Sequence, residues 1–353
     1  MTPFRFLFCV ILFLVGAGAS FIVPFVREGA GNQAAVVFGA YFCAMVIAEL
    51  VTYRFDAIRH WRFGVPVTSL LYAVSFAVMA FVRAPLGLVV GRALEGLSAG
   101  ARMPLLFRDA MTAEAKSRDR MLAAMNSLYA VGYVSGPFVA DVALLGMSSG
   151  AALVAFGALS LVVGVAMEAS RPRGMGLEKE EKHTPPPLQR FMLLFVGKFV
   201  YGFLLVSITS AGRPHLFSDR VSVVLLVLAI ALMVGQGIGV RLVARAPIDV
   251  LGVRITVALA PLCVAYAIWP GSVTLIAAAL VQGALLFVAV RAIGMKASDS
   301  KTYALFSALS DPGSALGAFT GRLGTNGALV VAVVALIPAL LRVAAPEPAS
   351  HRD

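Results

Sequence analysis

Apolar segments long enough to cross a membrane recur along this entire chain. A helix needs roughly 20 residues to span the hydrocarbon core of a bilayer. We expect such spans at residues 5–26, 33–53, 65–82, 86–107, 121–145, 150–168, 191–212, 221–240, 251–268, 272–293, 303–321 and 326–343. Since lipid offers the backbone no hydrogen bonds, these segments predict an all-α integral membrane protein with twelve transmembrane helices.

The composition argues against a soluble protein. Of the 353 residues, 60% are hydrophobic and 13% are charged, whereas a soluble domain carries about 25% charged residues. The net charge of +11 would fit a nucleic-acid-binding protein, but the basic residues stand between apolar segments and do not gather in a soluble domain. We therefore expect a lipid bilayer around the chain and no nucleic acid. The first apolar run continues to Val26, so we expect a spanning helix there rather than a signal peptide.

The basic residues also orient the chain. Most of them lie in segments that share one side of the membrane with the N-terminus, from Arg5 through Arg54 and Arg102 to Arg342. Few of them, Arg83 among them, lie on the opposite side. Cytoplasmic loops are enriched in Lys and Arg, so both termini are expected to be cytoplasmic, with the protein in the inner (cytoplasmic) cell membrane.

One polar stretch divides the chain into two halves. Residues 171–188 contain the run EKEEKHTPPP, whose prolines and mixed charges are typical of a linker. It separates a six-helix bundle at 1–170 from a second one at 189–345, and residues 346–353 form a cytoplasmic tail. Two glycines four residues apart occur in corresponding spans of the two halves, at Gly132 and Gly136 and at Gly313 and Gly317. This repetition favours two bundles related by a pseudo-two-fold axis.

Four ionisable residues within the spans are the candidates for a proton or substrate site. Arg92 and Glu95 are three residues apart, on one helix face, and could pair. A charge at this depth costs roughly 2.5–3.5 kcal/mol on insertion scales, so it should face protein or water. Lys198 lies in span seven and could instead reach the interface. Asp311 precedes Pro312, which we expect to weaken the helix beside the carboxylate.

These charges have both a structural and a functional interpretation. Arg92 and Glu95 could be a purely structural ion pair. Glu49, near the inner end of span two, could reach the interface or act in a gate. Buried carboxylates can take up and release protons, so Glu95 and Asp311 are the candidates for proton coupling. Carboxylates attract cations, and Arg92 and Lys198 attract carboxylates, which suggests a zwitterionic or cationic organic solute.

The cysteines and histidines give no sign of a metal site. Cys9, Cys43 and Cys263 stand inside apolar runs and are interpreted as small buried residues. The histidines fall in expected loops or tails, at His60, His183, His215 and His351. A membrane-embedded enzyme would need a nucleophile, an acid–base pair or a metal set at one membrane level, and no such set is apparent. We expect neither an enzyme nor a cofactor.

Two segments resemble the major facilitator superfamily of transporters. GRALEGLSAGA (Gly91–Ala101) resembles the family's fourth-helix pattern, in which a polar residue follows an Arg by three positions. GYVSGP (Gly132–Pro137) resembles its fifth-helix signature G-x-x-x-G-P, which is associated with antiporters. Gly132, Gly136 and Pro137 would allow close packing and a bend between moving helices. The resemblance points to a divergent branch near the drug:proton antiporters.

The family's signature between helices two and three is incomplete here. That signature is Gly-x-x-x-Asp-Arg, and in ELVTYRFDAIRHWRFG (Glu49–Gly64) either Arg54 or Asp56 can be matched, but not both in register. These residues are the candidates for a gating latch. The resemblance implies a monomeric secondary transporter that exports a small organic solute in exchange for protons. A proton-coupled uptake symporter and a receptor or scaffold that no longer transports remain alternatives.

Overall fold

The computed structural model describes residues 2–30, 33–82, 84–113, 115–172, 188–209, 221–243, 245–294 and 300–344. These residues form fourteen helices, and no strand occurs among them. Twelve of the helices correspond to the expected spans, so the predicted all-α fold is confirmed. The other two are short: α2 continues the first span, and α4 lies between the second and the third.

The N-terminal half is a bundle of six long helices. Its elements are α1 (Pro3–Phe21), α2 (Val23–Ala30), α3 (Ala34–Arg54), α4 (Asp56–Arg59), α5 (Gly64–Phe81), α6 (Leu86–Met111), α7 (Ala115–Leu144) and α8 (Ser149–Ala169). The C-terminal half is a second bundle. Its elements are α9 (Leu188–Thr209), α10 (Val221–Val243), α11 (Ile248–Ile268), α12 (Ser272–Gly294), α13 (Ser300–Gly321) and α14 (Thr325–Ala344).

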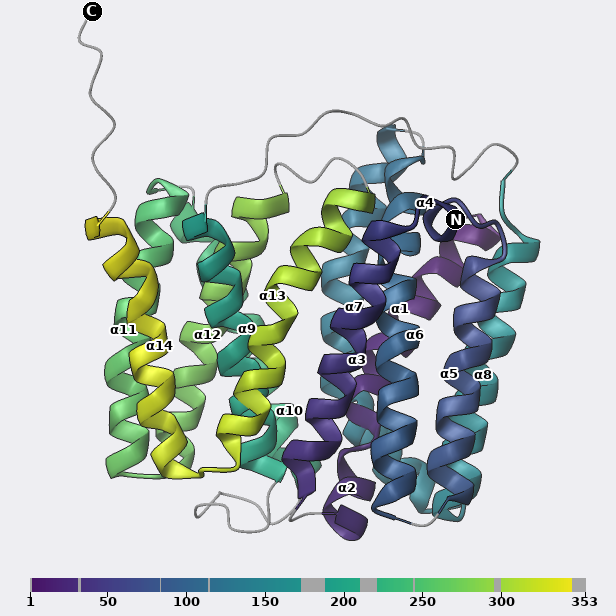
Figure 1. The fold of residues 1–353 in the computed structure, drawn as a ribbon, viewed down its shortest axis with the longest axis horizontal. Helices are drawn as coiled ribbons and strands as arrows, with labels where there is room; N and C mark the ends of the chain where they lie inside the picture. The colour runs from purple at the N-terminus through teal and green to yellow at the C-terminus, as the bar shows by residue number, and fades with distance from the viewer. Residues whose placement is uncertain are drawn as a thin grey trace, which may run out of the picture.

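The two bundles stand side by side with their helices roughly parallel to one direction (Figure 1). The N-terminus, α4 and the end of α14 lie at one face, which we call the N-terminal face, and α2 lies at the opposite face. Helices α3 and α13 pack against each other between the bundles. We call this boundary between the halves the seam. The expected linker and tail fall mostly on residues 173–187 and 345–353, outside the described residues, so their extents stay predictions.

Eight helices of the described residues are long and apolar enough to cross a membrane by length and composition. They comprise the first span (Pro3–Val26), α3, α5, α8 and parts of α10, α11, α12 and α14. Of the other four long helices, α6, α7 and α13 carry more polar residues, and α9 is apolar over Phe191–Ser207 except for Lys198. Because a polar span is stable in lipid only if its polar face meets protein, these four helices are where a site should be sought.

Glycines set the closest helix contacts in both halves. A Cβ atom at Gly132 or Gly136 of α7 would overlap the carbonyl oxygens of Phe13 or Ala17 on α1. The corresponding glycines of α13, Gly313 and Gly317, would overlap the carbonyl oxygens of two α9 residues, Phe195 and Phe199. The repeated spacing seen in the sequence is therefore a repeated contact, α1 with α7 and α9 with α13.

Two further glycine contacts extend the correspondence between halves. Gly96 of α6 lies against the Tyr41 carbonyl of α3, and Gly283 of α12 lies against the Leu232 carbonyl of α10. Small residues at helix crossings let backbones approach closely in membranes. The contact places α12 in the second half where α6 stands in the first, with Gln282 at the position of Glu95.

Three local expectations need correction. Helix α13 runs unbroken through Pro312, so the proline does not interrupt the helix beside Asp311. Cys43 is exposed rather than buried, whereas Cys263 is buried as expected. Arg102 was assigned to a cytoplasmic segment, yet it is fully buried within α6. His60 follows α4 outside the long helices as expected, while His183, His215 and His351 lie outside the described residues.

Candidate functional site

Arg92 and Glu95 form an ion pair in the core of the N-terminal half. The Arg92 Nη1 donates to Glu95 Oε2 at 2.6 Å, and both side chains are fully buried. The Arg92 Nη2 also donates to the Ala19 carbonyl of α1 at 3.3 Å. The pairing expected from their spacing is present. This pairing lets two charged side chains lie inside the helix bundle without facing lipid.

Aromatic rings cover this pair on the α3 side. The Arg92 guanidinium lies 4.0 Å from the ring centroid of Tyr41 and 5.4 Å from that of Phe38. Arginine over an aromatic face is a favourable cation–π contact, more so when desolvated. Glu95 Oε1 and Arg92 Nε are nevertheless buried without a hydrogen-bond partner in the described part of the chain. The pair therefore keeps one free acceptor and one free donor.

Tyrosines lead from this pair to the seam. Tyr41 and Tyr129 of α7 share a side-chain hydrogen bond. One turn further along α7, the Tyr133 ring lies 5.1 Å from the Tyr201 ring of α9, which belongs to the other half. The Tyr201 ring also lies 6.2 Å from Phe42 of α3. Sequence reasoning missed these tyrosines because single aromatic residues in apolar helices carry no signal of their own.

A second ionisable group crosses the seam itself. Lys198 of α9 pairs with Asp311 of α13, and the Glu49 carboxyl of α3 makes a side-chain hydrogen bond with Asp311. Glu49 and Asp311 are each only 2% exposed. Glu49 and Lys198 therefore do not extend to the interface as one interpretation of the sequence allowed. The three side chains join two helices of one half to a helix of the other.

The candidates for gating lie in two places. Gly132 and Gly136 pack against α1 as described above, and Pro137 lies inside the continuous helix α7. Arg54 ends α3 and Asp56 begins α4, and both are exposed at the N-terminal face. A latch role for Arg54 and Asp56 stays a prediction.

A denser ion-pair network in the N-terminal half involves residues that sequence reasoning did not select. Asp109 at the end of α6 accepts from Arg171 at 2.8 Å through each of its oxygens, and from Arg108 at 2.8 Å. Arg171 also donates to Glu168 of α8 at 2.8 Å, and Arg62 reaches Glu168 at 3.8 Å. Paired charges at the ends of spans four and six were the available signal. The network ties helices within the N-terminal half.

Arg102 is a further buried cation that the sequence did not reveal. Its Nη2 donates to the Thr68 carbonyl at 2.7 Å and to Ser98 Oγ at 3.0 Å, and its Nη1 donates to Ser160 Oγ at 3.4 Å. Its guanidinium also lies 4.8 Å from the ring centroid of Tyr72. Neutral acceptors on α5, α6 and α8 thus surround it. In the sequence, the only signal of these acceptors was the presence of hydroxyl residues, Thr68, Ser98 and Ser160, in three of the spans.

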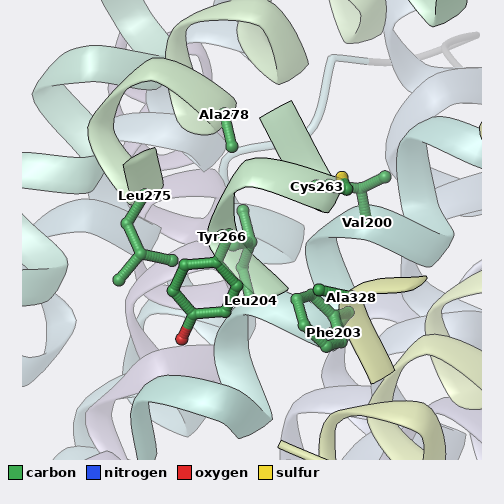
Figure 2. Close-up of a pocket in the computed structure, with 8 residues that line it drawn as sticks. All are labelled: Val200, Phe203, Leu204, Cys263, Tyr266, Leu275, Ala278 and Ala328. Carbon is green, nitrogen blue, oxygen red and sulfur yellow. The ribbon is translucent and has the colours of Figure 1, made fainter. Parts of the chain in front are cut away.

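A small apolar pocket lies inside the C-terminal half, away from these charges. It is lined by residues of α9, α11, α12 and α14, which are Val200, Phe203, Leu204, Cys263, Tyr266, Leu275, Ala278 and Ala328 (Figure 2). None of the ionisable candidates lines it. Among the described residues, no group of three or more His, Cys, Asp or Glu side chains is placed to hold a metal ion.

The two halves differ chemically at corresponding positions. Where α6 places Glu95, α12 places Gln282, a buried amide that donates to the Gly197 carbonyl of α9. The charged Glu95 of the N-terminal half thus has a neutral counterpart, Gln282, in the C-terminal half. The C-terminal half instead has an ion pair between α9 and α13, Lys198 with Asp311, at the seam. The pseudo-symmetry therefore holds for helix packing and not for the ionisable groups.

Solved structures with the same arrangement are transporters of the major facilitator superfamily. The E. coli fucose:proton symporter FucP superposes with a TM-score of 0.61 at 14% identity, covering 96% of this chain and 98% of the symporter. A structure of FucP in the outward conformation gives a TM-score of 0.61 at 15% identity, covering 98% of this chain and 99% of that chain.

The human organic anion transporter MFSD10 gives a TM-score of 0.69 at 15% identity, covering 96% of this chain and 98% of that transporter. In sequence, no protein-family model and no curated protein matches the chain. The structural likeness extends over nearly the whole length of both chains, so it includes both bundles. This chain has the twelve-helix major facilitator fold, two six-helix bundles related by pseudo-two-fold symmetry, in a multi-pass membrane protein.

Proposed function

We propose that this protein is a secondary active transporter that moves a small organic solute across the cytoplasmic membrane by alternating access. The observation that carries the proposal is the seam between the bundles. Ionisable side chains from both halves, Glu49, Lys198 and Asp311, meet there within the long helices, and the two carboxyl groups are buried. Buried charge of this kind is costly and marks solute or ion pathways in membrane proteins.

Proton coupling is the second part of the proposal. Glu95 and Asp311 are buried carboxyl groups, one in the N-terminal half and one at the seam. Each has a basic partner, Arg92 or Lys198, that can compensate its charge or release it when the partner moves. Protonation at one side of the membrane and release at the other would couple proton movement to the rocking of the halves.

The solute should be polar and carry at least one charge, cationic or zwitterionic. Glu95 Oε1 and Arg92 Nε have no hydrogen-bond partner among the described residues, so a solute with both an amine and an acceptor could satisfy them. Tyr41, Tyr129 and Tyr201 add rings and hydroxyl groups between this pair and the seam. Aromatic faces favour cationic groups.

Export rests on the resemblance of GYVSGP to the antiporter signature. The glycines of that segment pack α7 on α1, and Gly313 and Gly317 do the same for α13 on α9. The mirrored contact gives the segment a packing role in either transport direction. A proton-coupled uptake symporter is therefore the alternative.

The test uses the purified protein, reconstituted into liposomes in both orientations. A panel of cationic and zwitterionic organic solutes is first screened by thermal shift, since a ligand stabilises the state that it binds. Each solute that stabilises the protein is then added to vesicles with a trapped pH-sensitive dye. We expect solute-dependent proton movement that Glu95→Gln or Asp311→Asn reduces at least tenfold. Solute flux without proton movement would overturn the coupling, and the direction of proton movement relative to solute decides between export and uptake.

A further inference from the structure

Glu49 and Asp311 bring two carboxyl groups together across the seam. Glu49 is on α3 of the N-terminal half, Asp311 is on α13 of the C-terminal half, and their side chains share a hydrogen bond. A carboxylate has only acceptor atoms, whereas a carboxylic acid has one O–H donor. A hydrogen bond between these two groups therefore requires that one of them carries a proton.

The surroundings indicate which group holds that proton. Asp311 is already paired with the Lys198 ammonium group, which supplies its counter-charge. Glu49 Oε2 is buried, and no donor in the described part of the chain reaches it. Besides Lys198 on α9, the titratable groups that act on this pair are Tyr303 on α13 and Tyr129 on α7. Neither tyrosine supplies a positive charge that could compensate a second carboxylate.

We propose that Glu49 and Asp311 share one transported proton, and that this proton holds the two halves together at the seam. In this arrangement the Glu49 O–H donates to the Asp311 carboxylate. When the proton leaves, two carboxylates face each other with only Lys198 to balance them. Like charges in a buried site repel strongly, so α3 and α13 separate at this point. The inference rests on the proposed function, and it adds Glu49 to Asp311 as a group that links protonation to movement of the halves.

The sign of the pH dependence follows from this arrangement. The closed form binds one proton more than the separated form, so low pH favours closure and high pH favours separation. For a single proton, the ratio of closed to separated molecules changes by at most about tenfold per pH unit. This response needs neither a solute nor a membrane gradient.

Distance measurements between spin labels test the proposal directly. Cysteines replace two exposed residues of the N-terminal face, Phe55 after α3 and Arg342 near the end of α14, in a background without Cys9, Cys43 and Cys263. In the otherwise unchanged protein we expect the longer-distance population to grow with rising pH. Glu49→Gln should keep the closed distance at every pH, because its amide donates to Asp311 without a titrating proton.

A second variant and a matched control complete the experiment. Asp311→Asn should also remove the pH response, because its amide donates to the Glu49 carboxylate. This variant tests the proposal if Glu49→Gln does not fold. Glu168→Gln makes the same chemical change within the N-terminal half only, where Glu168 pairs with Arg171, and should keep the full response. A pH response that persists in both Glu49→Gln and Asp311→Asn overturns the proposal, as does an unchanged protein that ignores pH. Proton coupling at Glu95 would survive either result, because the vesicle assay measures it separately.

Discussion

At the scale of single residues, the Arg92–Glu95 pair buries two charged groups that each depend on the other for compensation. Replacing only Glu95 with Met leaves a fully buried guanidinium without its counter-charge. Breaking a buried pair from one side costs about 3–5 kcal/mol, whereas replacing both partners with apolar residues is often nearly neutral. We expect Glu95→Met to lower the thermal midpoint of the purified protein far more than the double variant Arg92→Met/Glu95→Met. If the double variant is the less stable of the two, the pair is not a coupled unit.

Arg102 makes a different prediction, because its partners are neutral acceptors. A lysine has a single ammonium group and cannot reproduce bonds that leave three nitrogens of a planar guanidinium. Buried groups left unpaired cost roughly 1–3 kcal/mol each. Arg102→Lys should therefore destabilise the protein nearly as much as Arg102→Met in thermal unfolding. The exposed Arg322 provides the control, since Arg322→Lys should change stability by less than about 0.5 kcal/mol. Full stability of Arg102→Lys would show that charge alone matters there.

The sequence allowed the charged candidates to be predicted only where they interrupt an apolar run. Arg92, Glu95 and Asp311 stand out in this way, and the first two pair as their spacing suggests. Arg102 does not stand out, because Arg108 and Asp109 follow it and make the segment look like the end of a span. Its acceptors come from other helices, and no spacing along one helix reveals such partners.

At the scale of elements, the glycine contacts should decide how closely α13 and α9 approach. A methyl group at Gly317 would overlap the Phe199 carbonyl, which is backbone and cannot move aside cheaply. Gly237, inside α10, has nothing near its missing Cβ, so alanine there only improves helix propensity by about 1 kcal/mol. We expect Gly317→Ala to lower the thermal midpoint and Gly237→Ala to leave it unchanged or raise it. Equal effects of the two substitutions would contradict the close contact.

Most helices could be predicted from hydropathy, because a span in lipid has a fixed length and needs internal hydrogen bonds. The structure places them within a few residues of the expected ranges, except that α7 starts earlier, at Ala115. The short helices α2 and α4 were missed, since neither is long enough to produce an apolar signal. The break expected at Pro312 did not occur, because α13 continues through the proline.

At the scale of the whole molecule, the two halves and their repeated contacts could be anticipated, but the seam could not. Which helices face each other across the halves depends on tertiary packing that no local pattern encodes. Glu49 was expected either to reach the interface or to act in a gate, and Asp311 was expected within a span. Only the packing of α3 on α13 brings them together. The rings of Tyr201 and Tyr133 meet for the same reason.

Ring contacts near the N-terminal face predict how the halves can be forced apart. The Phe107 ring of α6 stacks on Tyr303 of α13 with centroids 4.5 Å apart, which joins the halves. Phe191 and Phe306 make an edge-to-face contact at 5.2 Å within the C-terminal half. Aromatic pairs contribute about 0.5–1.5 kcal/mol beyond burial. Phe107→Ala should therefore raise the separated population at this face by roughly 2- to 10-fold, corresponding to that energy.

The labels at Phe55 and Arg342 report this change, and Phe191→Ala is the matched control. Phe191→Ala also removes a phenyl ring that contacts α13, but that contact lies within the C-terminal half, so the seam stays intact. It should lower thermal stability without lengthening the distance between the labels. If both variants lengthen that distance equally, loosened packing in general, and not the ring contact across the seam, controls opening. If only Phe107→Ala does so, the N-terminal face of the seam is a gate that the halves open by moving as two bodies.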